Sequence, residues 1–413
     1  MNQMAIPLSI PWLNLRGEAE QANKGARRGS AARTGGAPGV SPARVAHVVL
    51  TLNMGGLERM VLRLLERTDR SRFEPILCAL DEPGELAAEL PRLGVPVVTL
   101  GRAPGIDLKL ARRLSSWLEE ERVEIIHTHN SGPHFYGSLA ANMMFLRTGR
   151  RPRVIHTKHG PELSPSRWQP RMNQLSGLLS DRVIAVSSHT RDEVIQTERV
   201  RSDKVLTILN GVDPSEFAPG RDPRAARARL GVPLDGIHIG CVARLSPIKD
   251  HATLIDAFAR LKGRLPAVHL TLVGDGETRR DLEHRIQQHG LQGAVTFAGT
   301  RHDVHEILPA FDMFAMSSLT EGISLTLIEA AAAGLPSVAT RVGGNPEIID
   351  ELESGILVPP RNPSALAEAL FLVAVNPERA RMGQRARERV IERFSADKMA
   401  EAYQDLYAEL LKR

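Results

Sequence analysis

The hexapeptide Leu209-Asn210-Gly211-Val212-Asp213-Pro214 stands between two halves of the chain that repeat one pattern. Asn, Gly, Asp and Pro are favoured in tight turns, so this stretch predicts a break in regular structure. On both sides of it, short apolar runs alternate with helical patterns, which indicates parallel sheets covered by helices. The sequence therefore predicts an α/β protein with two doubly wound, Rossmann-like domains that face an interdomain cleft.

The predicted strands are spaced regularly through both halves. In the first half they cover residues 47–52, 76–80, 95–100, 125–128, 154–157 and 183–186. In the second half they cover residues 237–242, 270–273, 295–298, 313–315 and 337–339. Helical patterns fill the intervals, for example over residues 57–65, 108–121 and 224–230.

The length of 413 residues requires more than one domain. We expect residues 1–43, which are rich in Gly, Ala, Ser and Arg, to form a disordered basic tail. An N-terminal domain would then cover residues 44–209, and a C-terminal domain would cover residues 210–395. The last helix, residues 396–413, is expected to return to the N-terminal domain.

The charge is concentrated at the start of the chain. The net charge is +5, and residues 1–44 carry six basic side chains against two glutamates. The remainder is nearly neutral, so nucleic-acid binding is not expected. Aromatic residues make up 4% of the chain, which argues against a stacking platform for bases or polysaccharide. The tail could contact anionic lipid, although an inert tail is the commoner explanation.

The cysteine content and hydropathy favour a cytoplasmic protein. Cys78 and Cys241 both fall in apolar runs and are predicted to be buried thiols, as expected in a reducing compartment. No apolar run approaches the ~20 residues that span a bilayer. Residues 6–13 are short, contain Pro7 and Pro11, and lack a preceding basic flank, so a signal peptide is not expected.

The segment Glu321-Gly322-Ile323-Ser324-Leu325-Thr326-Leu327-Ile328-Glu329 carries the strongest functional signal. Gly322 allows a turn beside a ligand, and Ser324 or Thr326 can begin a helix whose free N–H groups bind an anion. Glu321 and Glu329 could each accept hydrogen bonds from hydroxyl groups. Two carboxylates flanking a phosphate-sized site suit a sugar on one side and a ribose on the other. The alternative is a solvated helix start with two unrelated glutamates.

Two cations follow the first strand of the second half. Arg244 and Lys249 are separated by a loop that contains Pro247. They can converge on one diphosphate, the arginine as a fork and the lysine as a point charge. Such a pair offsets the charge on a departing nucleoside diphosphate. Taken alone, a surface Arg and Lys are more often simply solvated.

Two glycine turns lie at predicted strand ends. Gly55 and Gly56 allow close backbone approach to a diphosphate or sugar, with a plain tight turn as the alternative. Gly274-Asp275-Gly276 is expected to leave room for the nucleotide. Neither turn is part of a Gly-x-Gly-x-x-Gly sequence, and no Gly-Lys-Ser/Thr occurs, so the dinucleotide fingerprint and the P-loop are both absent.

Three histidines end predicted strands in the first half. His127 and His129 would point the same way, but no Cys or carboxylate group accompanies them, and no metal is expected. His159, followed by Gly160 and Pro161, would face the cleft. It is the candidate for contacting a reacting sugar, with a capping or structural role as the alternative.

Together these motifs make the chain similar to the retaining GT-B glycosyltransferases of family 4, from about Val45 to the C-terminus. The motifs that carry the resemblance are Gly55-Gly56, His127-Thr128-His129-Asn130, His159-Gly160, Asn210-Gly211-Val212-Asp213, Arg244 with Lys249, Gly274-Asp275-Gly276, and the Glu321/Glu329 pair. Each motif is weak alone, whereas their order and spacing are specific. The resemblance implies metal-independent transfer of a hexosyl group from a nucleotide sugar, with no cofactor.

The resemblance also implies roles around the donor's phosphates. Arg244 and Lys249 would bind the diphosphate, and Glu329 would bind the ribose. Gly55 and Gly56 would let the acceptor-side domain close against the phosphates. Catalysis would then consist of positioning and electrostatic stabilisation, with the leaving diphosphate helping to deprotonate the acceptor.

Further roles concern the donor sugar. Glu321 would hold its hydroxyl groups, and His159 would meet it near the anomeric centre. The backbone that touches sugar and phosphate would come from Gly322, Ile323, Ser324 and Leu325. Ile323-Ser324 departs from the family, where an aromatic or small residue is common, and this departure leaves the choice of donor open between a UDP-sugar, which is favoured, and GDP-mannose.

The acceptor is expected to be a glycan or lipid-linked precursor in bacterial cell-surface or exopolysaccharide synthesis. Residues 108–121 present Leu110, Leu114, Trp117 and Leu118 on one face, which suits either docking on anionic lipid or ordinary packing on a sheet. A second basic cluster lies at residues 147–153. Both features prompt the hypothesis of peripheral contact at the inner face of the cytoplasmic membrane.

Two other functions remain open. A GT-B epimerase acting on UDP-GlcNAc would share the fold, although the motif order and the surroundings of Glu321 fit transfer better. A catalytically silent nucleotide-sugar-binding protein is the second alternative, and the intact set of Arg244, Lys249, Glu321 and Glu329 argues against it. An NAD-dependent dehydrogenase is excluded because the glycine fingerprint is missing.

Overall fold

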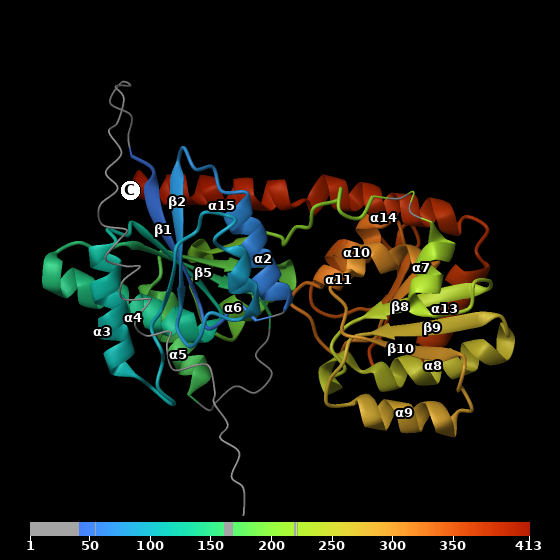
Figure 1. Cartoon of the computed structure of the whole chain (residues 1–413). Helices are drawn as coiled ribbons and strands as arrows, with labels where there is room; N and C mark the ends of the chain where they lie inside the picture. The colour runs from blue at the N-terminus through green and yellow to red at the C-terminus, as the bar shows by residue number, and fades with distance from the viewer. Residues whose placement is uncertain (1–40, 54, 161–167, 219, 221) are drawn as a thin grey trace, which may run out of the picture. The chain divides into compact units, whose positions relative to one another are not determined.

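The computed structural model describes residues 41–53, 55–160, 168–218, 220 and 222–413. Its strands form two parallel sheets, one in each half of the chain (Figure 1). Every paired strand within these sheets is parallel to its neighbour, with helices in the intervening chain. The predicted α/β class with two doubly wound, Rossmann-like sheets is confirmed.

The first sheet has seven strands in the order β3-β2-β1-β4-β5-β6-β7. Its strands are β1 (Ala43–Val49), β2 (Phe73–Ala79), β3 (Val97–Thr99), β4 (Ile125–His129), β5 (Arg153–Lys158), β6 (Arg182–Ala185) and β7 (Val205–Thr207). Its helices are α2 (Gly56–Glu66), η3 (Glu85–Glu89), α3 (Leu108–Glu120), α4 (Ser131–Thr148), α5 (Gln169–Leu179), α6 (Ser188–Gln196) and η4 (Ser202–Lys204). The strand order reverses between β1 and β4, the position where ligands bind in such sheets.

The second sheet has six strands in the order β10-β9-β8-β11-β12-β13, and it reverses between β8 and β11. Its strands are β8 (Ile237–Val242), β9 (Val268–Val273), β10 (Val295–Gly299), β11 (Met313–Met316), β12 (Ser337–Thr340) and β13 (Gly355–Val358). Helices of this half are α7 (Pro223–Leu230), η5 (Pro247–Lys249), α8 (His251–Arg264), α9 (Arg279–Gln288), α10 (Val304–Ile307), η6 (Leu308–Ala310), α11 (Leu325–Ala332), α12 (Asn345–Ile348) and α13 (Pro363–Val375). The chain ends with α14 (Arg379–Arg393) and α15 (Ala396–Leu411).

Side chains alternate along β1 between two cores. Ala46 and Val48 pack in the core that includes α3 and α4. Val45 and Val49 belong to the core that includes α2 and α15. Because both faces of such a strand are buried, its sequence is apolar almost throughout, which is why the alternation of runs and helices was readable.

The last helix, α15, completes the core of the first sheet. Its Tyr403 and Tyr407 are at most 1% exposed. The Tyr407 hydroxyl lies 2.7 Å from Nδ1 of His127, and the Tyr403 hydroxyl lies 3.0 Å from Oγ1 of Thr157. Residues far apart in the sequence thus share one set of buried hydrogen bonds.

The apolar face predicted on residues 108–121 is buried within the protein. Leu110, Leu114 and Leu118 on α3 are fully buried in the core shared with α4. Lipid docking by this face is therefore wrong, and the packing alternative is the correct one. A helix buries its apolar stripe against whatever surface is available, so periodicity alone cannot distinguish protein from lipid.

The basic cluster at residues 147–153 is largely paired. Arg147 forms an ion pair with Glu119. Arg151 and Arg153 contact the carboxylate of Asp181 at 2.9 and 3.5 Å. These three arginines therefore do not form an unpaired cationic patch.

Sequence patterns missed two edge strands and misplaced several strand boundaries by two to four residues, for example at β1, β2 and β9. β7 and β13 end their sheets and were not predicted, because an edge strand can be short and partly exposed. β1 begins at Ala43, four residues before the predicted start, because Ala43 and Arg44 pair with β2 although they are not strongly apolar. Cys78 and Cys241 are buried free thiols, as predicted.

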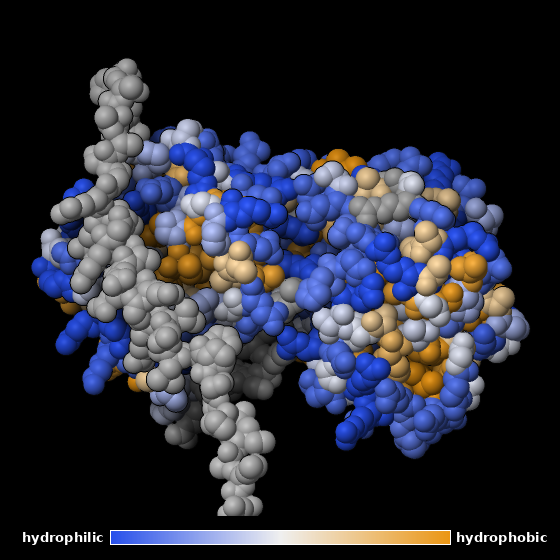
Figure 2. All heavy atoms as spheres, viewed as in Figure 1, coloured by the Kyte–Doolittle hydropathy of each residue, from blue (hydrophilic) through white to orange (hydrophobic). Residues whose placement is uncertain are grey.

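Residues Pro42–Arg413 form a single unit. Of the predicted tail, residues 1–40 lie outside the described residues. Among the described helices, none has the length and apolar character needed to cross a bilayer. On the face drawn in Figure 2, hydrophilic residues predominate and the hydrophobic patches are separate from one another.

Candidate active site

The segment between β11 and α11 adopts the helix start that the sequence predicted. Ser324 precedes α11, and its Oγ accepts the N–H of Leu327 at 3.2 Å. The Ser324 carbonyl accepts the N–H of Ile328 at 3.1 Å. The amides of Leu325 and Thr326 remain at the first turn, where both residues line the adjoining cavities. The helix start thus offers N–H groups to a bound anion.

Gly322 lies where the backbone of the two halves comes into contact. A Cβ atom on Gly322 would be 2.0 Å from the carbonyl oxygen of His159. On its other side, the N–H of Gly344 donates to the Gly322 carbonyl at 2.9 Å. Only glycine fits here, and the cause is the neighbouring backbone of His159, in addition to the turn that the sequence indicated.

A cavity of about 420 Å³, which we call the Glu321 cavity, collects most of the predicted site residues. It is lined by residues of both halves. The predicted residues among them are Gly55, Gly56, His159, Arg244, Lys249, Glu321, Ile323, Ser324 and Leu325. The predicted cleft between the two Rossmann-like domains is therefore present.

A second cavity of about 180 Å³, which we call the Glu329 cavity, adjoins the first. It contains the predicted residues Gly274 and Glu329, together with Arg59, Thr300 and Arg301. The two cavities share a wall that includes Gly55, Gly56, Arg244, Leu325 and Thr326. One site thus extends along the start of α11, with one carboxylate in each cavity.

Glu321 is held by two donors on a single oxygen. Its Oε1 lies 2.5 Å from Nζ of Lys249 and accepts the Ser318 hydroxyl at 2.6 Å. No described residue donates to Oε2. The carboxylate is therefore oriented by the protein, while its second oxygen is available for a ligand.

Glu329 has a different environment. Its side chain is 4% exposed, and Nη2 of Arg63 lies 3.8 Å from its Oε1, beyond hydrogen-bond distance. Burial raises the pKa of Glu329, and the charges of Arg63 and Arg59 oppose this shift. Nη1 of Arg63 is buried and has no partner among the described residues. Among the described residues, the buried Glu329 carboxylate and the Arg63 guanidinium group therefore lack a full set of hydrogen-bond partners.

Arg244 lines both cavities. No described residue forms a hydrogen bond or ion pair with its guanidinium group. Its charge acts on Glu58 of α2: burial raises the pKa of that carboxyl group, and Arg244 opposes part of the increase. The arginine can therefore direct its fork-shaped set of donors toward an anion in the shared wall.

Gly274 is required by its backbone. Its φ is +135°, and a Cβ atom there would lie 2.1 Å from the carbonyl oxygen of Ala243. Gly274 packs the end of β9 against the end of β8 and also lines the Glu329 cavity. The absence of a side chain at Gly274 thus lets the backbone after β8 lie close to it, and this contact shapes the cavity.

His159 contributes a neutral imidazole. Burial lowers its pKa to about 3, so the ring carries no charge at neutral pH. Its Nε2 lies 3.2 Å from Nδ1 of His129. Its Nδ1 is buried and has no partner among the described residues.

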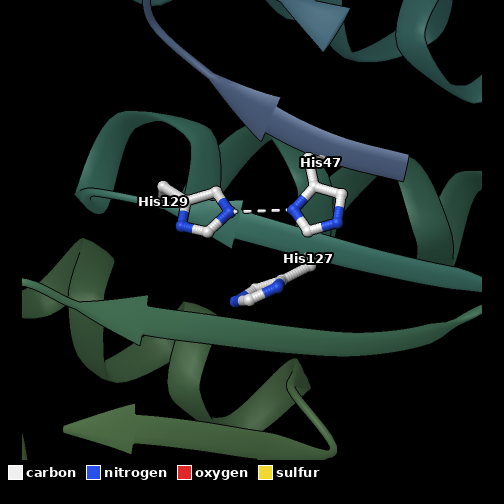
Figure 3. A group of neighbouring side chains, drawn as sticks. All are labelled: His47, His127 and His129. Carbon is white, nitrogen blue, oxygen red and sulfur yellow. Dashed lines mark hydrogen bonds between the residues drawn. The ribbon is translucent and has the colours of Figure 1, made fainter. Parts of the chain in front are cut away.

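His47, which the sequence did not single out, joins His127 and His129 in the one group of described residues that could hold a metal ion (Figure 3). Their candidate ligand atoms lie within 4.8 Å of one another. The two nitrogens of His127 each lie 2.7 Å from a hydroxyl, that of Tyr407 or that of Thr157. An ion could bind this ring only by displacing one of those hydrogen bonds.

The sequence patterns assigned no site role to several residues in or near these cavities. Asn210 lines the Glu321 cavity, and its Oδ1 is buried without a partner among the described residues. Its position in the turn between the two halves is the sequence feature that could have indicated a place in the cleft. Arg59 and Arg63 come from α2, more than 260 residues before Glu329, and nothing in their local sequence points to that carboxylate.

A third cavity of about 510 Å³ lies on the first half. Its lining includes Leu50, Arg102, Ser131, His159 and Gln169. It shares His159 and Leu57 with the Glu321 cavity. His159 therefore lies between a space that could hold a second substrate and the space beside Glu321.

Two families match successive parts of the chain. Residues 54–216 match Glycosyltransferase Family 4, and residues 222–389 match Glycosyl transferases group 1. The N-acetyl-alpha-D-glucosaminyl L-malate synthase of Bacillus anthracis is 29% identical over 75% of this chain and 81% of its own length. The UDP-Gal:alpha-D-GlcNAc-diphosphoundecaprenol alpha-1,3-galactosyltransferase of Escherichia coli is 25% identical over 90% of this chain and 98% of its own length.

A solved structure shares the fold. Anabaena HepE in complex with UDP-glucose is 23% identical, with a TM-score of 0.77 over 89% of this chain and 99% of that one. The similarity covers both sheets, and the two matched families account for most of the chain. The protein is a GT-B glycosyltransferase that belongs to the group 1 glycosyl transferases and uses a nucleotide sugar.

Proposed function

We propose that this glycosyltransferase transfers a hexosyl group with retention of configuration, without a divalent metal, from a UDP-sugar to a glycan or lipid-linked acceptor. The observation that supports this most directly is the pair of carboxylate cavities that share Arg244 and the first turn of α11. A nucleoside on one side, a sugar on the other and a diphosphate between them match the order of these groups. GDP-mannose is the less favoured donor.

The Glu329 cavity suits the nucleoside. Ribose hydroxyl groups would donate to Glu329, whose buried carboxylate accepts no hydrogen bond from a cation among the described residues. The diphosphate would lie against the amides of Leu325 and Thr326, with Arg244 and Lys249 supplying positive charge. Two side-chain cations and a helix start would provide the charge stabilisation that other glycosyltransferases obtain from a metal.

The Glu321 cavity suits the donor sugar. Oε2 of Glu321 would accept hydrogen bonds from sugar hydroxyls while Lys249 and Ser318 hold Oε1. Lys249 is 24% exposed on its side chain and lies beside the shared wall, so it would also contact the phosphate nearest the sugar. His159 would meet the sugar near the anomeric carbon, because it separates this cavity from the third one.

The reaction would proceed on one face of the sugar. The acceptor oxygen forms a bond to the anomeric carbon as the bond to the leaving diphosphate breaks. The acceptor proton passes to an oxygen of that diphosphate, whose charge Arg244 and Lys249 offset. The protein would therefore act by positioning and by electrostatic stabilisation.

The domain roles follow from this arrangement. Residues 44–209 would bind the acceptor in the third cavity, and residues 210–395 would bind the nucleotide sugar. Residues 396–413 would belong structurally with the acceptor domain. The name of the Escherichia coli relative, which specifies UDP-Gal and a diphosphoundecaprenol acceptor, favours a UDP-sugar and a lipid-linked acceptor here as well.

A lipid-linked acceptor would require peripheral contact with anionic lipid at the cytoplasmic membrane face. Because the apolar face of α3 is buried, the contact would use its start, where Ile106 and Leu108 are 66% and 64% exposed beside Lys109. Trp168, 49% exposed, precedes Gln169 of the third cavity. Flotation with anionic vesicles at low salt tests this contact, and absence of binding would exclude it.

The test of the function is a panel of UDP-, GDP- and ADP-sugars, with and without EDTA, read by thermal stabilisation and donor hydrolysis. We expect one UDP-sugar to stabilise the protein and to be hydrolysed slowly in EDTA. Arg244→Ala should abolish both effects, and the matched change of the exposed Arg280→Ala on α9 should not. If no donor stabilises or is hydrolysed by the parent protein, the proposal fails.

The same panel separates the alternatives. An epimerase would return a UDP-sugar of altered configuration, whereas a transferase releases UDP. A silent nucleotide-sugar-binding protein would be stabilised without turnover. With an acceptor present, the anomeric configuration of the product, measured by NMR coupling constants, tests retention.

A further inference from the structure

Three histidines form a chain of hydrogen bonds behind the Glu321 cavity. His129 on β4 uses both ring nitrogens: Nδ1 lies 3.2 Å from Nε2 of His159, and Nε2 lies 3.2 Å from Nδ1 of His47. Figure 3 shows the second contact, with the His47 and His129 rings meeting at their nitrogen atoms. The chain therefore runs from β1 through β4 to the residue that lines the cavity.

The rings meet at their edges. The ring centroids are 5.5 Å apart for His47 and His129 and again for His129 and His159. By contrast, His134 and His156 stack face to face, with centroids 3.7 Å apart. Edge contact at 3.2 Å between nitrogens is a hydrogen bond, which needs one N–H and one lone pair.

All three rings are neutral. Burial lowers the pKa of His47 and of His159 to about 3, and it lowers the pKa of His129 well below its usual value. A neutral imidazole carries one N–H and one acceptor nitrogen. His129 must therefore donate from one nitrogen and accept at the other.

This condition leaves two possible arrangements of the protons on the three hydrogen-bonded histidines. In one, every ring carries its proton on Nε2, and Nδ1 of His159 is an acceptor. In the other, every ring carries its proton on Nδ1, and Nδ1 of His159 is a donor. No ring can change alone without breaking a hydrogen bond, because the bond at one nitrogen fixes the role of the other.

We propose that His129 and His47 are positioning residues that hold His159 in the Nε2–H tautomer, so that the lone pair on its Nδ1 accepts a hydrogen bond from a substrate hydroxyl group. The Nε2–H form is the one that neutral histidine favours in water, and it suits all three rings at once. Nδ1 of His159 is the ring nitrogen that is buried without a partner among the described residues. The substrate role of His159 rests on the proposed function, whereas the tautomer assignment does not.

His127 lies beside this chain but is bonded elsewhere. Its ring centroid is 4.2 Å from that of His129, yet its nitrogens face Tyr407 and Thr157. Tyr407→Phe therefore provides a control. It removes a buried hydrogen bond beside the three histidines and leaves the hydrogen bonds among His47, His129 and His159 intact.

Two substitutions of His129 separate its two hydrogen bonds. In His129→Asn the side-chain amide occupies the place of Nδ1, so a partner for His159 remains and the bond to His47 is lost. In His129→Gln the amide reaches the place of Nε2, so the bond to His47 remains and His159 loses its partner. If His129 only filled space, the variant that loses the bond to His159 would not be affected more than the variant that loses the bond to His47.

The tautomer is read directly by two-bond ¹⁵N–¹H correlation NMR on protein labelled at histidine. We expect a single Nε2–H tautomer for His159 in the parent, in Tyr407→Phe and in His129→Asn, and a mixture in His129→Gln. A single Nδ1–H form, or a mixture in the parent, would overturn the proposal. So would one bound metal ion per chain in metal analysis of the purified protein.

Kinetics give the second readout. His129→Gln should lower kcat at least in proportion to the fraction of His159 that has left the Nε2–H form in the NMR spectrum, since a wrong tautomer disables an imidazole whose position is otherwise intact. KM for the donor should change little, and His129→Asn should stay close to the parent. Equal losses in both variants, in parallel with their melting temperatures, would reduce the role to packing. If the parent turns over no donor, the proposed function fails, and the NMR result still decides the tautomer.

Discussion

Glu321 and Glu329 lie at the two ends of one segment, yet their surroundings differ in kind. Glu321 receives Lys249 and Ser318 on a single oxygen, at 2.5 and 2.6 Å. Glu329 is more deeply buried, and its ion-pair partner Arg63 is 3.8 Å away. A carboxylate that the protein already orients can place a reacting group accurately. A buried carboxylate without full compensation instead gains most when a ligand supplies the missing donors.

The largest effect is expected from removing the charge of Glu321. Glu321→Gln keeps the size of the side chain and loses the attraction to Lys249, so both the sugar contact and the position of the lysine are disturbed. We expect kcat to fall about 10²–10³-fold, the range for removing one oriented group at a reacting centre. Glu277→Gln, a change at an exposed carboxylate near the same strand ends, is the control. A Glu321→Gln protein as active as the parent would contradict the assignment of this cavity.

The second effect concerns the contact that brings the two halves together at this segment. In Gly322→Ala the new Cβ would meet the His159 carbonyl, whereas in Gly56→Ala it would meet Leu325 Cδ1 at an ordinary 3.4 Å. Gly322→Ala should lower the free energy of unfolding by about 1–3 kcal/mol and reduce activity, as overpacking does. Chemical denaturation of both variants provides the measurement. Equal behaviour of the two alanine variants would show that the backbone contact is not needed.

A smaller effect is expected at the other carboxylate. Glu329→Gln should raise KM for the donor about tenfold, because a hydrogen bond from a ribose hydroxyl to a charged acceptor becomes one to a neutral acceptor. Its effect on kcat should be smaller than that of Glu321→Gln. Steady-state kinetics on the same donor separates the two variants, and the reverse ranking would invert the assignment of sugar and nucleoside.

The smallest effect is on stability and its dependence on pH. Burial raises the pKa of Glu329 in the folded protein, so its contribution favours folding below the unfolded pKa and is lost as pH rises through the folded pKa. Glu329→Gln should therefore melt higher than the parent at neutral pH, and the difference should shrink toward pH 4. A lower melting temperature for the variant at neutral pH would mean that the attraction of Arg63 and Arg59 outweighs burial.

Much of this comparison was readable from the sequence. The segment from Glu321 to Glu329 was recognised by its glycine, its helix-starting serine and the spacing of its carboxylates. Ser324 caps the helix as expected, and the two carboxylates line separate cavities. Local sequence sufficed because the turn and the helix start depend mainly on neighbouring residues.

The partners of these carboxylates were less accessible. Arg63 reaches Glu329 from the first half of the chain, and the ion pair between Lys249 and Glu321 spans two loops of the second half. Such contacts depend on strand order and on how the halves meet, which no local pattern encodes. His47 illustrates the same limit: it pairs with His127 across β1 and β4, and only the sheet order makes them neighbours.

The position of α15 has a consequence for the synthesis of this protein. Tyr407 bonds His127 across 280 residues, so a buried polar group of the first sheet obtains its partner near the end of the chain. During translation the first half therefore emerges without the helix that covers one face of its sheet. This half of the protein stays incomplete until the last residues have left the ribosome. Its uncovered sheet surface is open to association with other chains during that time, because the long-range contacts that cover it form last.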